Sequence, residues 1–376
     1  MQKRTFKKTG EKISLLGMGV MRLPETSGGL IDEDLSVKII RRAIDGGVSY
    51  VDCAYTYHGG ASEKVLGKAL KNGYREKVFI ADKIPSWLAK DEKDIEKMFE
   101  ESFARLDVDF IDMYLIHNIT APIWKKVQKL NVIPFLEQKQ KEGKIGHLGF
   151  SFHDSLSLFK EVVNFRRWDF CQIQLNYMDS DIQAGVEGLR YAASKGLSVI
   201  IMEPLKGGRL TDTVPSSIKE IWDRAETKRS PAEWCFRWVA DFPEVTTILS
   251  GMSTMEQLEE NLKIIENCLP ESLTENEHSL IEEVADKYRE LIKYQCTDCK
   301  YCMPCPFKVD IPRCLSLYNE WFLYDKNPKT LMEYKNWMDK RQRASNCADC
   351  KECESKCPQQ LHITEAMKKI KNEFGE

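Results

Sequence analysis

Short apolar runs alternate with amphipathic stretches along the first two thirds of the chain. Apolar runs of this length indicate strands that are buried on both faces, as in a parallel sheet. The stretches between them repeat apolar residues at helical spacing, as in Asp34–Asp45, Asp94–Leu106 and Met255–Ile265. The expected strands are Leu15–Val20, Tyr50–Ala54, Val78–Lys83, Ile111–His117, Ile145–Ser151, Phe170–Asn176, Val199–Pro204 and Thr246–Met252.

This alternation predicts an α/β fold, namely a (β/α)8 TIM barrel, because eight strand–helix units fit into roughly 250 residues. A doubly wound open sheet is the alternative. It is disfavoured because no strand is followed by a glycine-rich dinucleotide fingerprint. Residues Thr5–Ser14 predict an N-terminal hairpin with a turn at Thr9-Gly10, in a position to close the bottom of the barrel.

The remaining chain predicts a second, different domain. A charged helical stretch, Asn276–Lys293, follows the barrel and links it to a cysteine-rich tail. The tail contains an aromatic-rich insert that is expected to be helical, so we predict a mainly helical ferredoxin-like domain. The predicted boundaries are 1–270 for the barrel, 271–293 for the linker helix and 294–376 for the tail.

Two cysteine runs in the tail have the spacing of iron–sulfur ligands. The first run precedes Pro306 and the second precedes Pro358. Three closely spaced cysteines followed by a Cys-Pro form the ligand pattern of bacterial cubane clusters. The residues are Cys296, Cys299, Cys302 and Cys305 in the first run, and Cys347, Cys350, Cys353 and Cys357 in the second.

In two-cluster ferredoxins the cysteine before the proline binds the other cluster. We therefore expect two 4Fe-4S clusters, with Cys305 and Cys357 exchanged between the runs. Cys357 would complete the cluster of Cys296, Cys299 and Cys302, and Cys305 that of the second run. A pair of all-cysteine zinc sites is the alternative, but zinc requires neither the third closely spaced cysteine nor the proline.

Composition narrows the possible partners. A net charge of −3 gives no signature of nucleic-acid binding. No apolar run approaches about 20 residues, so no transmembrane helix is expected, and the N-terminus shows no secretory signal. The cysteines outside the two runs are scattered. Thiolate-ligated clusters suit a reducing compartment, so a cytoplasmic location is expected.

Four polar residues fall at or just after the carboxyl ends of consecutive predicted strands, where barrel enzymes place their catalytic groups. Asp52 ends the second strand, and Tyr57 lies in the loop that follows it. Lys83 ends the third strand and His117 ends the fourth. Each alone is a weak signal, but together they form one constellation.

These residues lie in motifs that resemble the aldo-keto reductase family. The stretch from Gly47 to Glu63, which contains Asp52-Cys-Ala-Tyr-Thr-Tyr57, is similar to the family's first signature. Tyr114-Leu-Ile-His117 is similar to its fourth-strand motif, and Gly143 to Ser151 to its fifth-strand segment. The cysteine tail resembles that of an iron–sulfur branch of the same family.

The resemblance implies NAD(P)H-dependent reduction of an aldehyde or ketone. Tyr57 would donate the proton, and the ammonium of Lys83 is expected to lower the pKa of Tyr57. Asp52 would hold Lys83, and His117 would orient the substrate oxygen. Asp82 directly precedes Lys83, and strand alternation turns it away from the barrel mouth, where a structural carboxylate is expected.

The resemblance also implies a nicotinamide cofactor, NADP or NAD. Ser151 and Gln172 match the carboxamide-binding positions, and Met202 stands where many relatives stack an aromatic ring. Gly251 and Gln257 replace a Lys and an Arg of many relatives that pair with a 2′-phosphate, which weakens the case for strict NADPH use. The remaining matched positions are Pro204, Leu205 and Gly207 at the pyrophosphate, and Ser253, Glu260 and Asn261 at the adenosine.

Two functions remain open at this point. In the first, the protein reduces a small carbonyl substrate, and the clusters are structural or serve a ferredoxin or flavodoxin-type electron partner. In the second, it is an iron–sulfur electron-transfer or redox-sensing protein whose barrel is catalytically altered. The complete set of Asp52, Tyr57, Lys83 and His117 favours the first function.

Overall fold

The computed structural model describes residues 1–211, 214–324 and 326–376. These residues divide into two compact units. The first comprises Met1–Leu205 and Ala232–Leu273, and the second comprises Lys206–Pro231 and Thr274–Glu376. The segment Lys206–Pro231 groups with the C-terminal residues, and most of the stretch expected as a linker helix lies within the second unit.

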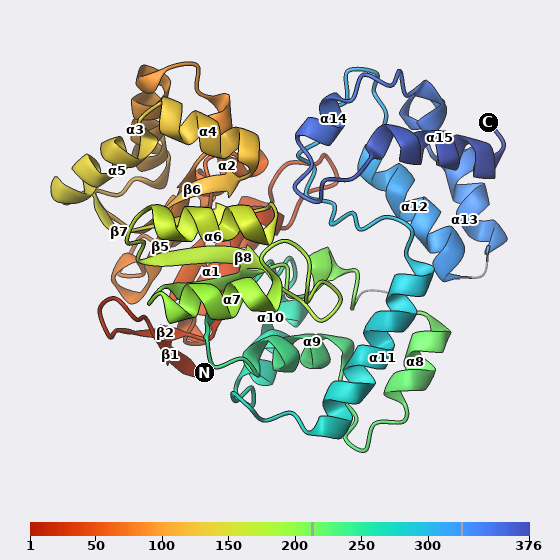
Figure 1. Cartoon of the computed structure of the whole chain (residues 1–376), viewed down its shortest axis with the longest axis horizontal. Helices are drawn as coiled ribbons and strands as arrows, with labels where there is room; N and C mark the ends of the chain where they lie inside the picture. Colours follow the sequence, from red (N-terminus) through yellow and green to blue (C-terminus); the bar gives the residue numbers. More distant parts are fainter. Residues whose placement is uncertain (212–213, 325) are drawn as a thin grey trace. The chain divides into compact units, whose positions relative to one another are not determined.

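Within the described residues, eight parallel strands close into a barrel, which confirms the predicted fold (Figure 1). The strand order around the barrel is β10-β3-β4-β5-β6-β7-β8-β9, so strands that are neighbours in the sequence are neighbours in space. The strands are β3 (Leu16–Gly19), β4 (Tyr50–Asp52), β5 (Phe79–Ile84), β6 (Ile111–Ile119), β7 (Ile145–Phe152), β8 (Phe170–Gln174), β9 (Ser198–Met202) and β10 (Val245–Ser250).

Helices cover the outside of the barrel between successive strands, and Figure 1 shows α6 and α7 on either side of β8. Side-chain caps fix where several of them begin, since Asp32 accepts from Leu35 N–H at the start of α1 and Asp91 from Asp94 N–H at α3. The helices are α1 (Glu33–Asp45), α2 (Ala61–Ala69), α3 (Glu92–Leu106), α4 (Ala121–Lys129), α5 (Val132–Lys141), α6 (Leu156–Phe165), α7 (Gly185–Ser194), α9 (Pro231–Ala240) and α10 (Met255–Ile265).

The predicted N-terminal hairpin is confirmed. Strands β1 (Lys3–Thr5) and β2 (Lys12–Ser14) pair antiparallel, with the turn at the residues between them. Phe6 at the base of the turn is fully buried, in one apolar cluster with residues of the barrel strands such as Tyr50 and Phe170. The hairpin therefore contributes directly to the barrel core.

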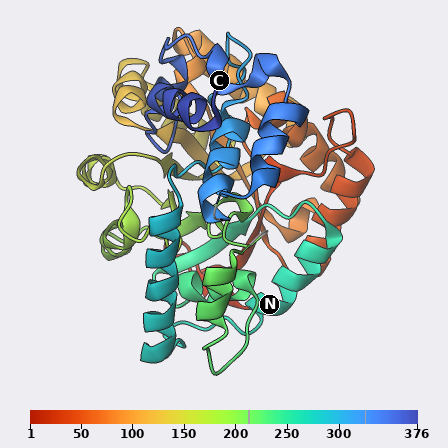
Figure 2. The same cartoon turned by 90° about the vertical axis from the view of Figure 1, so that its right-hand side faces the viewer.

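The second unit begins with a helix pair. Helix α8 (Ser216–Trp222) lies beside α11 (Glu275–Leu291), and both views show the two side by side (Figures 1 and 2). Helix α11 begins with a capping box between Thr274 and Glu277. The guanidinium of Arg229 donates to the Glu277 carboxylate, which attaches the end of the inserted segment to the start of α11.

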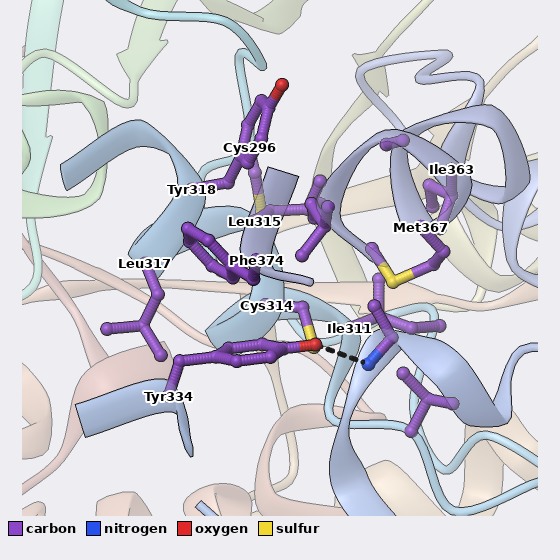
Figure 3. Packing of buried hydrophobic residues seen from close by; sticks show 14 of the residues in the cluster. Cys296, Ile311, Cys314, Leu315, Leu317, Tyr318, Tyr334, Ile363, Met367 and Phe374 are labelled. Carbon is purple, nitrogen blue, oxygen red and sulfur yellow. Dashed lines mark hydrogen bonds between the residues drawn. The ribbon is translucent and has the colours of Figure 1, made fainter. Parts of the chain in front are cut away.

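The cysteine-rich part is mainly helical, as predicted. Its helices are α12 (Ile311–Leu323), α13 (Pro328–Met332), α14 (Glu352–Ser355) and α15 (Ile363–Phe374). Their apolar faces form one core, in which Tyr334 packs against Phe374 with ring centroids 4.6 Å apart (Figure 3). The Tyr334 hydroxyl accepts a 2.9 Å hydrogen bond from Ala344 N–H. No helix in the described part of the chain is long and apolar enough to cross a membrane.

Candidate active site

The carboxyl ends of three adjacent strands bring the predicted catalytic side chains together. Asp52 is the last residue of β4, Lys83 lies near the end of β5, and His117 lies in the second half of β6. Because β4, β5 and β6 pair in parallel, these residues meet at one rim of the barrel. All three are almost completely buried.

The loop after β4 is shaped to place Tyr57 at the same rim. His58, Gly59 and Gly60 all adopt positive φ, and Ala61 then starts α2. Gly60 is required twice over, since its φ is +91° and a Cβ there would lie 2.5 Å from the guanidinium of Arg105. The sequence Tyr57-His-Gly-Gly therefore forms the turn that directs Tyr57 into the barrel mouth.

The resulting geometry converges on the ammonium of Lys83. Its Nζ lies 2.6 Å from Asp52 Oδ2, 2.6 Å from the Cys53 carbonyl oxygen and 3.1 Å from the Tyr57 hydroxyl. The ring of His117 packs edge-on to Tyr57, with 6.0 Å between centroids. One cation is thus held by a carboxylate and a carbonyl while it faces a phenol.

The electrostatics of Tyr57 differ from the sequence expectation. Burial raises the pKa of the phenol well above its ordinary value, and the Asp52 carboxylate adds to the effect. The expected lowering by Lys83 does not prevail, because the ammonium is already paired with Asp52 at closer range. Tyr57 is therefore protonated in the resting site and available as a proton donor.

His117 is neutral for the same physical reasons. Burial lowers its pKa well below the ordinary value, and the nearby Lys83 charge and His153 lower it further. A neutral imidazole donates one hydrogen bond without competing for the proton of Tyr57. His117 is thus suited to binding a carbonyl oxygen.

Two residues beside His117 were missed by the sequence analysis as site residues. The indole of Trp87 lies 5.1 Å from the His117 ring, between centroids. His153 follows β7 and is buried, and burial lowers its pKa to about 4. His153 follows a strand end, which is the one signal that would have identified it.

The residues matched to the carboxamide-binding positions lie on β7, β8 and β9. Ser151 Oγ accepts a 2.7 Å hydrogen bond from Asn118 N–H, so its hydroxyl proton remains for a ligand. Gln172 Nε2 lies 3.5 Å from Met202 Sδ. Gln172 Oε1 is buried and has no hydrogen-bond donor among the described residues. An orphaned amide oxygen of this kind fits a ligand that brings an N–H group, as a carboxamide does.

The residues matched to the adenosine end lie around the start of α10. Gly251, Gln257 and Glu260 are exposed, whereas Asn261 is buried and donates to Ser250 Oγ at 3.1 Å. Gln257 Oε1 accepts from Ser253 N–H. Asn261 thus supports the end of β10.

Arg22 was not recognised in the sequence as part of this region. Its side chain passes next to Gly251, where a Cβ would lie 3.3 to 3.5 Å from the Arg22 stem. Its carbonyl accepts a 2.7 Å hydrogen bond from Ser253 Oγ. A cation from the other end of the chain therefore lies where Gly251 leaves space.

Three residues were matched to the pyrophosphate by resemblance. Pro204 and Leu205 follow β9 in the first unit, whereas Gly207 belongs to the second. Gly207 has a φ of 67°, which fits a tight turn. Asn176, near the carboxamide positions, is occupied locally, since its oxygen accepts from the amides of Met178 and Asp179.

The two cysteine runs share one backbone conformation in the second unit. The central residues Cys299 and Cys350 are each flanked by an Asp and a Lys, and all four flanking residues have φ between 55° and 62°. Asp298 N–H donates to Cys296 Sγ at 3.5 Å. Left-handed residues turn successive amides inward, toward a concave site that favours anions.

The structure places the cysteine runs so that they interleave. One cavity is lined by Cys305 together with Cys347, Cys350 and Cys353, and also by Cys302. Cys357 lies close enough to the first run to raise the pKa of Cys296 and of Cys302, although burial is the main cause of both shifts. The residues that precede the prolines thus each lie beside the opposite run.

This donor set fits iron–sulfur clusters chemically. Crowded thiols raise one another's pKa, which makes several thiolates unfavourable without a positive charge among them. An iron cluster supplies that charge and holds the thiols in their deprotonated form. Among the described residues, no three His, Cys, Asp or Glu side chains converge on a geometry for a single metal ion.

Comparisons with known protein families agree with this division of the chain. Residues 15–286 match the model described as the aldo/keto reductase family. Residues 295–362 match the model of a 4Fe-4S dicluster domain.

The similar proteins cover the barrel but not the whole chain. L-galactose dehydrogenase of Arabidopsis thaliana is 26% identical over 309 residues, which cover 77% of this chain and 95% of that protein. An NADH-specific methylglyoxal reductase of Escherichia coli is 24% identical over 332 residues, covering 76% and 99% of the two chains. An aldo-keto reductase from Bacillus halodurans, solved in its holo form, superposes with a TM-score of 0.63 at 24% identity, covering 76% and 96%.

Proposed function

The chain belongs to the aldo/keto reductase family and carries a 4Fe-4S dicluster domain, and on this basis we propose that it reduces an aldehyde or ketone to an alcohol with a nicotinamide cofactor. The observation that carries the proposal is the contact of 3.1 Å between Lys83 Nζ and the hydroxyl of a buried, protonated Tyr57. A proton donor and its stabilising cation stand together at the barrel rim.

A nicotinamide held at the barrel mouth would supply the hydride, and the carbonyl carbon would accept it. Tyr57 donates its proton to the carbonyl oxygen as negative charge develops there, so that the C=O bond becomes C–H and O–H. The tyrosinate left behind lies beside Lys83, whose ammonium stabilises it only once the proton has left. Asp52 keeps that ammonium in place, and His117 donates a hydrogen bond to the same oxygen.

The carboxamide of the nicotinamide would be held by Ser151 and Gln172. The hydroxyl proton of Ser151 and the orphaned Gln172 Oε1 form a complementary pair of donor and acceptor. Met202, next to Gln172, provides a thioether surface for the ring.

We propose that Arg22 contributes to recognition of the adenosine 2′-phosphate. Two positions that are cationic in many relatives are Gly251 and Gln257 here, which weakens the case for strict NADPH use. The side chain of Arg22 next to Gly251 offers a replacement for the lost charge. The protein should then use NADPH and NADH with a modest preference for NADPH.

For the clusters, we propose that Cys296, Cys299, Cys302 and Cys357 hold one and that Cys347, Cys350, Cys353 and Cys305 hold the other. These clusters stabilise the second unit or pass electrons to a ferredoxin or flavodoxin-type partner. In either role, thiolate-bound clusters need a reducing compartment, and we place the protein in the cytoplasm on that ground.

The test is the rate of NADPH and NADH oxidation with a panel of small aldehydes and ketones, with and without reduced ferredoxin. We expect turnover with the nicotinamide alone. Turnover that appears only with reduced ferredoxin would instead support the electron-transfer function, with the barrel altered in its chemistry.

A further inference from the structure

Behind the catalytic lysine, on the outer face of β5, lies a buried group of polar side chains that the reduction chemistry does not use. Asp82 precedes Lys83, and its side chain points the opposite way, toward α2 and α3. It is fully buried, as is Glu63 of α2. The carboxyl therefore lies in the layer between the sheet and the helices, where an unpaired charge is costly.

This group has fewer hydrogen-bond donors than carboxyl oxygens that need them. Arg105 donates to Glu63 Oε2 at 2.8 Å, which leaves Glu63 Oε1 and both oxygens of Asp82 buried. None of these three oxygens receives a hydrogen bond of normal geometry from any residue that the structure describes.

Hydroxyls nearby cannot make up the deficit. Ser102 of α3 interacts with Asp82 and Glu63, and also with the hydroxyl of Tyr114 on β6. A hydroxyl has a single proton, so Ser102 satisfies one of these acceptors at most. The backbone N–H of Lys83 also reaches Asp82. With both donors used, at least one of the three carboxyl oxygens still has no proton.

The balance of charges around Asp82 also indicates that one proton is missing from the pair. The cations near Asp82 are Arg105, which is paired with Glu63, and Lys83, which is paired with Asp52. With both Asp82 and Glu63 ionised, one buried negative charge would have no partner. The titratable and charged groups around Asp82 and Glu63 are Arg105 on α3, Lys83 on β5, Cys53 directly after β4, Tyr57 in the following loop and Tyr114 on β6.

We propose that Asp82 and Glu63 share one proton as a carboxylic acid–carboxylate pair, and that this makes Asp82 a positioning residue for Lys83. The proton satisfies the facing oxygens and removes the surplus charge. With the pair singly charged and matched by Arg105, the ammonium of Lys83 is directed to Asp52, Tyr57 and the Cys53 carbonyl, away from Asp82.

The electrostatics are consistent with this arrangement. Burial raises the pKa of Asp82 well above its ordinary value, and the Glu63 carboxylate raises it further. An ionised Asp82 would also raise the pKa of Tyr57. Loss of the shared proton would therefore place a second anion behind Lys83 and weaken the stabilisation of the tyrosinate.

The part that concerns Lys83 rests on the proposed carbonyl reduction, but the proton itself does not. Infrared difference spectra of the holoprotein at neutral pH, wild type against D82N, test the proton without turnover. We expect a carboxylic-acid C=O band in the wild type that is absent from D82N. E63Q is a second variant in which the amide donates to Asp82, so the same band should disappear.

The shared proton would be overturned if the wild type had no protonated-carboxyl band that is lost in folded D82N or folded E63Q. This outcome does not depend on whether the protein reduces carbonyls. The link to Lys83 is tested by the shape of the pH profile of kcat. The wild type should lose activity on the alkaline side at lower pH than D82N, since the amide of that variant cannot ionise. Superimposable alkaline limbs in the two proteins would overturn the positioning role, because a purely structural Asp82 predicts that result.

Discussion

The two units position their chemical groups by different means. In the first unit, Asp52, Lys83 and His117 lie on strands whose backbone is fixed by pairing with their neighbours. In the second unit, the cysteines of the first run lie on a chain without helix or strand between α11 and α12. The barrel site is therefore organised before any ligand binds, whereas the cysteine loops depend on the group that they hold.

The sharpest test of this contrast is Tyr57→Phe, which removes only the hydroxyl that faces Lys83. We expect kcat for carbonyl reduction to fall by about 10² to 10⁴, because general acid catalysis contributes that much. Iron content should stay unchanged. Steady-state kinetics and an iron assay check both, with Tyr191→Phe, on α7 and outside the set at the barrel rim, as the control. Near-normal turnover in Y57F would remove Tyr57 from the mechanism.

The second test disturbs the other unit. Cys350→Ser should lower the iron content by about half, because one of two clusters loses a ligand. Its effect on kcat should be far smaller than that of Y57F. Electron paramagnetic resonance of the reduced protein should show one signal for each cluster. Cys305→Ser should change the same signal as C350S. Cys357→Ser should change the same signal as Cys299→Ser.

Cys314 provides the matched control for the cysteine variants, since it is buried in the core of the same unit but lies outside both runs. Cys314→Ala should keep both signals. Grouping of C305S with C299S would show that each run holds its own cluster, contrary to the proposed exchange.

A smaller effect is expected at the edge of the barrel, where the site depends on the half-buried side chain of Arg22. Arg22→Ala should weaken NADPH binding by about tenfold relative to NADH, since a hydrogen bond to a charged group contributes about 1.5 kcal/mol or more. Fluorescence titration with both cofactors measures the ratio, with Arg22→Lys expected to fall in between. An unchanged ratio in R22A would exclude Arg22 from 2′-phosphate recognition.

The smallest effect concerns the stability of the barrel. Burial opposes ionisation of Asp169, but hydrogen bonds from His147, Leu148 N–H and Lys8 outweigh it and lower its pKa to about 2. A lowered pKa contributes stability above the unfolded-state value of about 3.9, and this contribution is lost as the pH falls toward 2.

Asp169→Asn should therefore lower the stability of the barrel by about 1 to 2 kcal/mol at neutral pH, a figure reduced to allow for partial solvent screening. The difference from the wild type should shrink below about pH 4. Thermal melts followed by circular dichroism at several pH values check this, with the exposed Asp181→Asn as the control. A difference that persists at low pH would contradict the electrostatic origin.

The contrast between the units also explains how much of the structure could be predicted from the sequence. Buried parallel strands leave continuous apolar runs, so all the predicted barrel strands were found, with ends displaced by a few residues. The set of Asp52, Tyr57, Lys83 and His117 was found because each lies at or just after the end of a strand. Here local pattern and tertiary position carry the same information.

What sequence reasoning missed depends on contacts between distant segments. Arg22 reaches Gly251 only because β3 and β10 close the barrel. The partner of Asp82 is Glu63, from a helix that no strand pattern connects to it. The pKa of Tyr57 was expected to fall because a lysine was near, but burial and Asp52 decide it. Desolvation and competing partners have no local signature in a sequence.

The helix pair α8 and α11 has a consequence for the order in which the chain is made. The ribosome synthesises α8 and then the last strand of the barrel before it reaches α11. Until then the apolar face of α8, with Ile218, Ile221 and Trp222, has no partner helix to cover it. A chain cut after Leu273 would keep that face uncovered permanently, so a truncation that removes only the iron–sulfur part should retain α11.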